Sequence, residues 1–158
     1  MARIVSIHSF RGGTGKSNTT ANVAAVLAQS GQRVGVIDTD IQSPGIHVLF
    51  GLSGDHLTAS LNDYLWRNRS ISEVAMDVSA NLGATITGKI FLIPSSVNPG
   101  EITRVLREGY DARRLTQGLR SLVDDLKLDV LIIDPHPGLK EDTLLTIVIS
   151  HALIVVMR

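Results

Sequence analysis

A glycine-rich loop near the amino end constrains the fold of this chain more than any other feature. Residues 10–18 read FRGGTGKSN, follow an apolar run at residues 4–7, and precede a stretch with apolar residues at helical spacing. In such a loop the glycines let the backbone turn its N–H groups inward, and the N-terminus of the following helix attracts anions. The pattern predicts a strand, a phosphate-binding loop and a helix, in that order.

The residue types of this loop suit contact with the phosphates of a nucleotide. The mobile charge of Lys16 is expected to reach the β- and γ-phosphates, and the Ser17 hydroxyl is expected to ligate a magnesium ion. A glycine turn that binds no nucleotide is the alternative. The predicted nucleotide-binding residues are Gly12, Gly13, Thr14, Gly15, Lys16, Ser17, Asn18 and Gly138.

Short continuous apolar runs recur along the chain and predict the strands of a sheet. Runs without polar alternation suit strands that are covered on both faces, as in a parallel sheet with helical crossovers. We therefore predict an α/β fold: one doubly wound, mainly parallel sheet with helices on both faces, in a single domain over residues 1–158. The predicted strands are Ile4–Ile7, Val34–Ile37, Ile90–Ile93, Val130–Ile133 and Ile154–Met157.

Helix signals lie between these runs. Gly31 is predicted to cap the C-terminus of the first helix. Asn98 is predicted to be the N-cap of a second helix, with Glu101 as its capping-box partner, and Asp111 is predicted to begin a third. That last helix carries an apolar stripe, which we interpret as core. Its residues are Leu115, Leu119, Leu122, Val123 and Leu126. Two short helices are expected in the weaker middle region, at Leu61–Trp66 and Ile71–Val78.

Composition excludes several classes of site within this segment. The chain has 158 residues, no cysteine, and equal numbers of acidic and basic side chains. Disulfides and thiolate metal sites are therefore excluded here, and no overall field attracts nucleic acid or anionic lipid. No signal peptide is evident and no apolar run reaches a membrane-spanning length of about 18 residues, so we expect a soluble cytoplasmic protein without a transmembrane segment.

Three carboxylates follow predicted strands and complete the candidate site. Asp38 and Asp40 come after the second run, and Asp134 ends the run VLIID in the form of a Walker B strand. Ligands bind at the carboxyl ends of strands in open α/β sheets, and magnesium prefers oxygen ligands. We predict Ser17, Asp38 and Asp134 as the magnesium site; for Asp38 and Asp40 the alternative is two solvated turn carboxylates.

The loop R-G-G-T-G-K-S resembles the deviant phosphate loop K-G-G-x-G-K-[ST] of the MinD/ParA family of ATPases. Arg11 stands where that family carries its signature lysine. The D-x-D element at residues 38–40 is similar to the family's first switch. Residues 134–138, DPHPG, are similar to its second switch, D-[ST]-P-P-G.

The resemblance implies an ATPase that binds Mg-ATP and dimerises when nucleotide is bound. It also implies a switch in the positioning or partitioning of a cargo, with ATP hydrolysis that is slow until a partner protein activates it. It assigns Asp38 to the hydration shell of magnesium and Asp40 to orienting the attacking water. It lets the Gly138 N–H reach the γ-phosphate. The expected catalytic residues are Arg11, Lys16 and Asp40. Family members are longer, so we expect this chain to lack the C-terminal part, and ATP rather than GTP rests on analogy alone.

Two departures from the family pattern stand out. Two roles are open for Arg11. It contacts the nucleotide of a second copy across a dimer, as an arginine finger in trans, or it is an exposed loop cation and the dimer mechanism is lost. Pro135 removes a hydroxyl and a backbone donor from the second switch, which puts its geometry in doubt. We assign no acid–base role to His136, and expect loop or core roles for His8, His47, His56 and His151.

Other functions stay open from the sequence. An arginine cluster on two predicted helices suits nonspecific DNA binding or, because acidic residues interleave with it, a solvated helix face. Its residues are Arg104, Arg107, Arg113, Arg114 and Arg120. A carrier of metal clusters shares this loop, but the absence of cysteine counts against it. A small-molecule kinase or ligase and a noncatalytic nucleotide-binding module are further alternatives.

Overall fold

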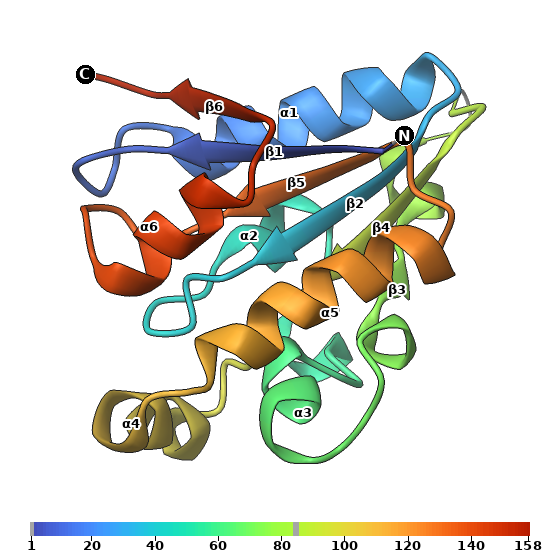
Figure 1. Ribbon diagram of the computed structural model, residues 1–158. Helices are drawn as coiled ribbons and strands as arrows, with labels where there is room; N and C mark the ends of the chain where they lie inside the picture. The colour runs from blue at the N-terminus through green and yellow to red at the C-terminus, as the bar shows by residue number, and fades with distance from the viewer. Residues whose placement is uncertain (1, 84–85) are drawn as a thin grey trace.

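The structure is a computed structural model that describes residues 2–83 and 86–158 (Figure 1). Within those residues, six strands form a single sheet. The strands are β1 (Arg3–His8), β2 (Arg33–Asp38), β3 (Met76–Asp77), β4 (Lys89–Ile93), β5 (Val130–Asp134) and β6 (Ala152–Val155). The sheet order is β3-β4-β2-β5-β1-β6. All neighbours are parallel except β3, which runs antiparallel to β4.

Helices cover both faces of the sheet, as predicted (Figure 1). The α-helices are α1 (Lys16–Gln29), α2 (Ile46–Leu49), α3 (Leu61–Trp66), α4 (Pro99–Glu108), α5 (Ala112–Asp125) and α6 (Glu141–Val148), with 3₁₀ turns at Gly54–His56, Ser72–Val74 and Ser79–Leu82. Helices α1 and α2 pack against one face, while α3 and α5 pack against the other. Every strand of the parallel part except the edge strand β6 is largely buried, which explains its continuous apolar sequence.

The apolar stripe on α5 lies in the core, as expected. Leu115, Leu119 and Leu122 are buried in the same cluster as Ile37 and Ile133 of the sheet. The N-cap of the helix is Asp111, whose side chain accepts hydrogen bonds from two backbone N–H groups of the first turn. The predicted cap and the predicted apolar face therefore fix both the start and the orientation of α5.

The sequence prediction was wrong in two segments. Residues 71–78 were expected to form a helix, but they form a 3₁₀ turn followed by β3, because Met76 and Asp77 pair with the edge of β4. The last strand was expected at Ile154–Met157 and runs instead from Ala152 to Val155, since its register with β1 begins at Val5. Pairing with a neighbour outweighed local pattern in both cases.

Two predicted caps are confirmed, at Gly31 and Asn98, but the capping box expected at Asn98 is absent. Gly31 follows α1 with a φ of 91°, the left-handed conformation expected of a C-terminal glycine. Asn98 caps α4 by accepting from the N–H groups of Gly100 and Glu101. The expected capping box is absent there, because the Glu101 carboxylate forms an ion pair with Arg67 of the segment after α3.

Gly88, directly before β4, has no room for a side chain. A Cβ at this position would lie 2.1 Å from the Gln32 carbonyl oxygen and 2.7 Å from that of Ala28. The Gly88 N–H donates to the Ala28 oxygen at 2.9 Å, and the next N–H donates to Gln32. The end of α1 and the start of β4 are thus joined by direct backbone contact.

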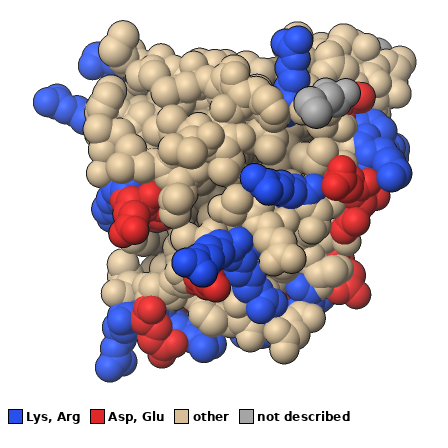
Figure 2. Space-filling model, viewed as in Figure 1, with Lys and Arg blue, Asp and Glu red and all other residues tan. Residues whose placement is uncertain are grey.

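None of the helices in the described part of the chain is long and apolar enough to span a membrane. Figure 2 shows the face that carries α5 and α4, where basic and acidic side chains alternate over the lower half. In the upper part of this view the middle is tan, and separate basic side chains stand at its margins.

Candidate functional site

The loops that follow β1, β2 and β5 meet at the carboxyl edge of the sheet (Figure 1). The register places Asp38 and Asp134 side by side at the ends of adjacent parallel strands. The glycine loop follows β1, which lies on the other side of β5. Sequence segments separated by about a hundred residues in the chain are therefore brought to one edge by the strand order.

The glycine loop surrounds a hollow of about 310 Å³, here called the glycine-loop hollow. Gly13 and Gly15 have φ values of 74° and 90°, which a residue with a side chain adopts only with strain. Gly15 is also the N-cap of α1, so that the helix N-terminus lies beside the hollow. Its lining residues are Ser9, Gly12, Gly13, Thr14, Gly15, Lys16, Ser17, Asn18, Asp40, Ser43 and Pro137.

A buried cluster at the start of α1 centres on Asp134. The Lys16 ammonium forms an ion pair with one oxygen of this carboxylate, with side-chain exposures of 8% and 2%. The Ser17 hydroxyl donates to the other oxygen at 2.7 Å, and the Thr20 hydroxyl lies 3.3 Å from the first. Lys16, predicted to contact phosphate, and Ser17, predicted to ligate the metal, are therefore both joined to Asp134, by an ion pair and a hydrogen bond.

Asp38 is almost fully buried at the end of β2. Its carboxylate accepts from the backbone N–H of Asp40 at 2.9 Å and from that of Gly45 at 3.3 Å. Burial, together with the nearby Asp134 carboxylate, raises the pKa of Asp38 to about 8. A cation placed beside these two carboxylates would relieve that repulsion, so the oxygen donors Ser17, Asp38 and Asp134 suit a hard divalent ion.

Asp40 lines the glycine-loop hollow and is held by two residues. Its carboxylate accepts from the backbone N–H of Ser43 at 3.1 Å and from the Ser43 hydroxyl at 3.0 Å. The His136 Nδ1 atom lies 2.7 Å from Asp40 Oδ1, which links the loop after β2 to the loop after β5. The two aspartates of the D-x-D element thus differ in placement: Asp40 borders the hollow, whereas Asp38 lies behind it.

Two further contacts hold the loop after β5. The Gly138 N–H, expected from the resemblance to face a γ-phosphate, donates to the Ser9 carbonyl at 2.9 Å. The Lys140 ammonium donates to Gln42 of the loop after β2 at 2.8 Å. Three loops of the carboxyl edge are therefore joined to one another.

Arg11 and Asn18 lie at the exposed rim of the site. The Arg11 guanidinium makes no hydrogen bond or ion pair within the described residues, and its carbonyl accepts from the Ser9 hydroxyl at 2.9 Å. An arginine in this position is available to a group outside the chain. The choice between a finger in trans and a loop cation stays a prediction.

Sequence reasoning missed three polar residues of this edge. Thr20 lies four residues after Lys16 on the same helix face, and Ser43 lies three residues after Asp40, so spacing alone could have suggested both. Ser9 gave no comparable signal, because its contact with Gly138 depends on how two distant loops fold together.

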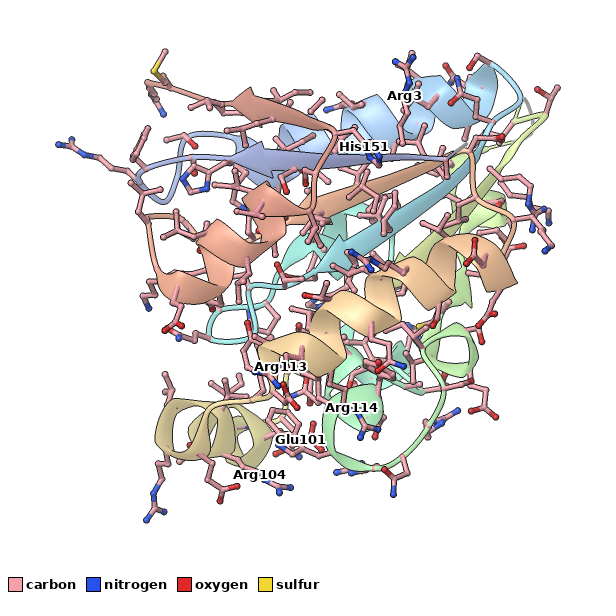
Figure 3. All side chains as sticks on the ribbon, viewed as in Figure 1. Arg3, Glu101, Arg104, Arg113, Arg114 and His151 are labelled. Atoms are coloured by element: carbon pink, nitrogen blue, oxygen red, sulfur yellow. The ribbon has the colours of Figure 1, made fainter. Side chains whose placement is uncertain are left out.

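The predicted arginine cluster carries interleaved charge. Glu101 and Arg104 lie on α4, and Arg113 and Arg114 lie in the first turn of α5; all four are labelled in Figure 3. Arg104 pairs with Glu108 at 2.9 Å and covers the Trp66 ring, while Arg114 lies 5.1 Å from the Tyr64 ring centroid. These contacts favour a solvated helix face, and nonspecific DNA binding stays a prediction.

The remaining histidines hold structural positions. His151, labelled in Figure 3, accepts from the Ile4 N–H through Nδ1 at 3.0 Å. Burial, and secondarily the nearby Lys16 charge, lowers the pKa of His8 below its usual 6.5. Burial likewise lowers the pKa of His47. No group of three or more histidine or acidic residues in the described chain is arranged to hold a metal ion on its own.

Comparison with known proteins agrees with this geometry. A family model described as an AAA domain matches residues 2–158. An uncharacterized ATP-binding protein of Methanocaldococcus jannaschii is 31% identical over the whole chain, which covers 53% of that protein. An iron-sulfur cluster carrier protein of Aquifex aeolicus is 44% identical over 135 residues, which are 85% of this chain and 33% of that protein.

The structural comparison gives the same result. The septum site-determining protein MinD of Pyrococcus horikoshii, solved with Mg-ADP, matches with a TM-score of 0.79 and 25% identity over 99% of this chain and 58% of that one. The chain thus spans only part of the length of these three relatives, between 33% and 58%. With the family model covering nearly every residue, the chain belongs to the AAA-domain family and, within it, to the MinD/ParA-like P-loop ATPases.

Proposed function

We propose that this chain binds Mg-ATP at the carboxyl edge of its sheet and hydrolyses it as a nucleotide-dependent switch. The observation that carries the proposal is the meeting of three segments: the glycine loop, the carboxylates after β2, and Asp134 at the end of β5. The solved relative with Mg-ADP and the relative named as ATP-binding support the choice of nucleotide.

The residues divide the work of binding. Main-chain N–H groups of the loop at residues 12–18 receive the phosphates, and Lys16 exchanges its contact with Asp134 for the β- and γ-phosphates. Ser17, Asp38 and Asp134 would hold magnesium, which when bound neutralises phosphate charge. The N–H of Gly138 leaves the Ser9 carbonyl to reach the γ-phosphate.

Hydrolysis in such a site depends on position and charge more than on a strong base. Asp40 borders the glycine-loop hollow, a position from which its carboxylate can orient the attacking water. Arg11, exposed at the rim, contributes to the site of a second copy of the chain across a nucleotide-dependent dimer. Association and release of two copies would then follow binding and hydrolysis, as a cycle that positions or partitions a cargo and is accelerated by a partner protein.

Calorimetry with Mg-ATP, Mg-ADP and Mg-GTP tests the binding step. We expect heat of binding with Mg-ATP that is lost on chelation of magnesium and in Lys16→Ala. Folded protein that binds none of these nucleotides would refute the proposal. Lys127→Ala, a lysine in the turn after α5, is a control that should bind as the wild type does.

Light scattering with ADP, ATP and a nonhydrolysable analogue tests the switch, with phosphate release measured in parallel. Arg11→Ala should reduce turnover and ATP-dependent dimerisation far more than ATP affinity. Arg107→Ala, an exposed arginine on α4, is the matched control. Unchanged turnover and dimerisation in Arg11→Ala would rule out the role in trans.

A carrier of iron–sulfur clusters is the second candidate, favoured by the relative from Aquifex aeolicus. The 158 residues contain no cysteine, so thiolate ligands for a cluster would have to come from outside this chain. Iron and sulfide analysis of the anaerobically prepared protein separates the candidates. Stoichiometric iron that is lost on ATP hydrolysis would favour the carrier, and its absence would favour the switch.

A further inference from the structure

The Asp40 carboxylate is fixed unevenly at its two oxygens. Oδ1 lies within 3.1 Å of the Ser43 N–H and hydroxyl, and 2.7 Å from His136 Nδ1. Among the described residues, Oδ2 has a single hydrogen-bond partner, the Ser43 hydroxyl at 3.0 Å, and that hydroxyl has only one proton to share between the two oxygens. Oδ2 therefore retains capacity to accept a further hydrogen bond, while Oδ1 is saturated.

The histidine must be the donor in its contact with Asp40. An ionised carboxylate only accepts hydrogen bonds, so the proton between the two residues belongs to Nδ1 of His136. Both side chains are mostly buried, with exposures of 21% for His136 and 12% for Asp40. Shielding from water strengthens such a contact and limits its exchange with solvent.

The backbone presents this histidine rigidly. Pro135 and Pro137 flank it, which fixes φ at both neighbours and restricts the conformation of His136 itself. The His136 carbonyl accepts from the Thr143 hydroxyl at 3.4 Å, and Gly138 is tied to Ser9 at 2.9 Å. The imidazole therefore approaches Asp40 from a stiff segment that is fastened on both sides.

We propose that His136 is a positioning residue for hydrolysis: its Nδ1–H bond to Asp40 Oδ1 turns Oδ2 toward the water that attacks the γ-phosphate. This inference rests on the proposed function and names a residue beyond its phosphate and metal contacts. The water oxygen bonds to the γ-phosphorus, the bond to the bridging oxygen breaks, and ADP leaves. One water proton passes to a γ-phosphate oxygen, so that phosphate leaves as H₂PO₄⁻ while Asp40 and His136 keep their protonation.

Four variants test this inference by single-turnover phosphate release and Mg-ATP calorimetry: His136→Ala, His136→Asn, Asp40→Asn and the double variant Asp40→Asn/His136→Ala. His136→Ala should slow hydrolysis about tenfold or more, since a misdirected catalytic group loses orientation, with Mg-ATP affinity changed less than about threefold. Asparagine can place an N–H near the position of Nδ1, so His136→Asn should recover most of the rate. In the double variant the histidine should have no further effect.

The exposed His56 supplies the matched control, because His56→Ala removes an imidazole whose hydrogen bond, among the described residues, is to the Ser53 hydroxyl. Its hydrolysis rate should equal that of the wild type. Nitrogen-15 NMR of the histidine rings gives a readout independent of activity. In the wild type His136 should carry its proton on Nδ1, and Asp40→Asn should shift that signal while leaving the His56 signal unchanged.

The outcomes separate the two proposals. Wild-type protein that hydrolyses ATP, alongside a His136→Ala variant of equal rate, overturns the positioning role alone. The positioning role is also overturned if the fold losses in rate of the two single variants multiply in the double variant. A His136→Asn variant that is as slow as His136→Ala has the same meaning. Wild-type protein that binds or hydrolyses no nucleotide overturns the proposed function and this inference together.

Discussion

Two ion-paired clusters of this molecule differ in burial. At the start of α1, Lys16 and Asp134 are exposed by only 8% and 2%. After α3, Arg67 contacts Asp63 and Glu101 with its own side chain 62% exposed. Removing a charge from water costs several kcal/mol per ion. An exposed ion pair has little desolvation cost and contributes little to the free energy of unfolding.

This contrast suggests why the buried charges are present. Apolar residues of similar volume would pack as well at the start of α1 without the cost of desolvation. A cluster retained against that cost is typical of a site whose groups serve a ligand. The exposed cluster needs no such explanation, because its charges stay largely hydrated.

Lys16→Met gives the largest expected effect, because it leaves Asp134 buried without its cation and beside Asp38. We expect the free energy of unfolding to fall by about 3–5 kcal/mol, measured by urea denaturation, together with loss of Mg-ATP binding. The double variant Lys16→Met/Asp134→Asn should regain at least half of the stability and none of the binding. If Lys16→Met were as stable as the wild type, the buried and exposed clusters would not differ in the way proposed.

Thr20→Val is expected to cost about 2 kcal/mol, because it removes the one hydroxyl proton that the buried Lys16 carbonyl and the Asp134 carboxylate share. The hydroxyl contacts are 3.1 and 3.3 Å long. Thr116 on α5 makes the same contact to a carbonyl four residues back, at 3.0 Å, without a carboxylate. Thr116→Val should therefore cost clearly less, and equal losses would show that Asp134 gains nothing from Thr20.

Acidification should destabilise the protein through His8. Because burial lowers its pKa below 6.5 in the folded state, the unfolded chain binds more protons below that pH. Stability then falls as the pH drops below 6.5, by at most about 1.4 kcal/mol per pH unit from this residue. Asp38, with its raised pKa, acts in the opposite sense over the same range, so the His8 contribution is read as a difference between two proteins. From pH 7 to pH 5, the stability of His8→Leu measured by thermal unfolding should rise relative to that of the wild type.

Arg67→Met gives the smallest expected effect, between about 0 and 1 kcal/mol. The loss should shrink further in 0.5 M salt, because exposed charges are screened. A double-mutant cycle with Glu101→Gln isolates the pair. A coupling as large as that between Lys16 and Asp134 would mean that exposure does not distinguish the two clusters.

The sequence predicted the parts of the fold that local patterns control. The strands at residues 4–7, 34–37 and 130–133 are buried on both faces, so their apolar runs are long enough to recognise. The strand β3 has two residues and forms only by pairing with β4, which no local signal records. Its sequence therefore resembled a helix.

The site follows the same division. Loop composition predicted that glycines, Lys16 and Ser17 would surround a hollow beside a helix N-terminus. The contact between His136 and Asp40 joins residues 96 positions apart, and only the strand order brings them together. Spacing along the chain could not reveal it.

The backbone contact at Gly88 has a consequence for engineering this protein. Because a Cβ there would meet the Gln32 carbonyl oxygen at 2.1 Å, the last residue before β4 tolerates no substitution without moving α1 or the sheet. Insertions and tags in the preceding connection must therefore end before this residue. In a saturation library, this half-buried glycine, which does not line the hollow, would then be depleted of variants as strongly as the site itself.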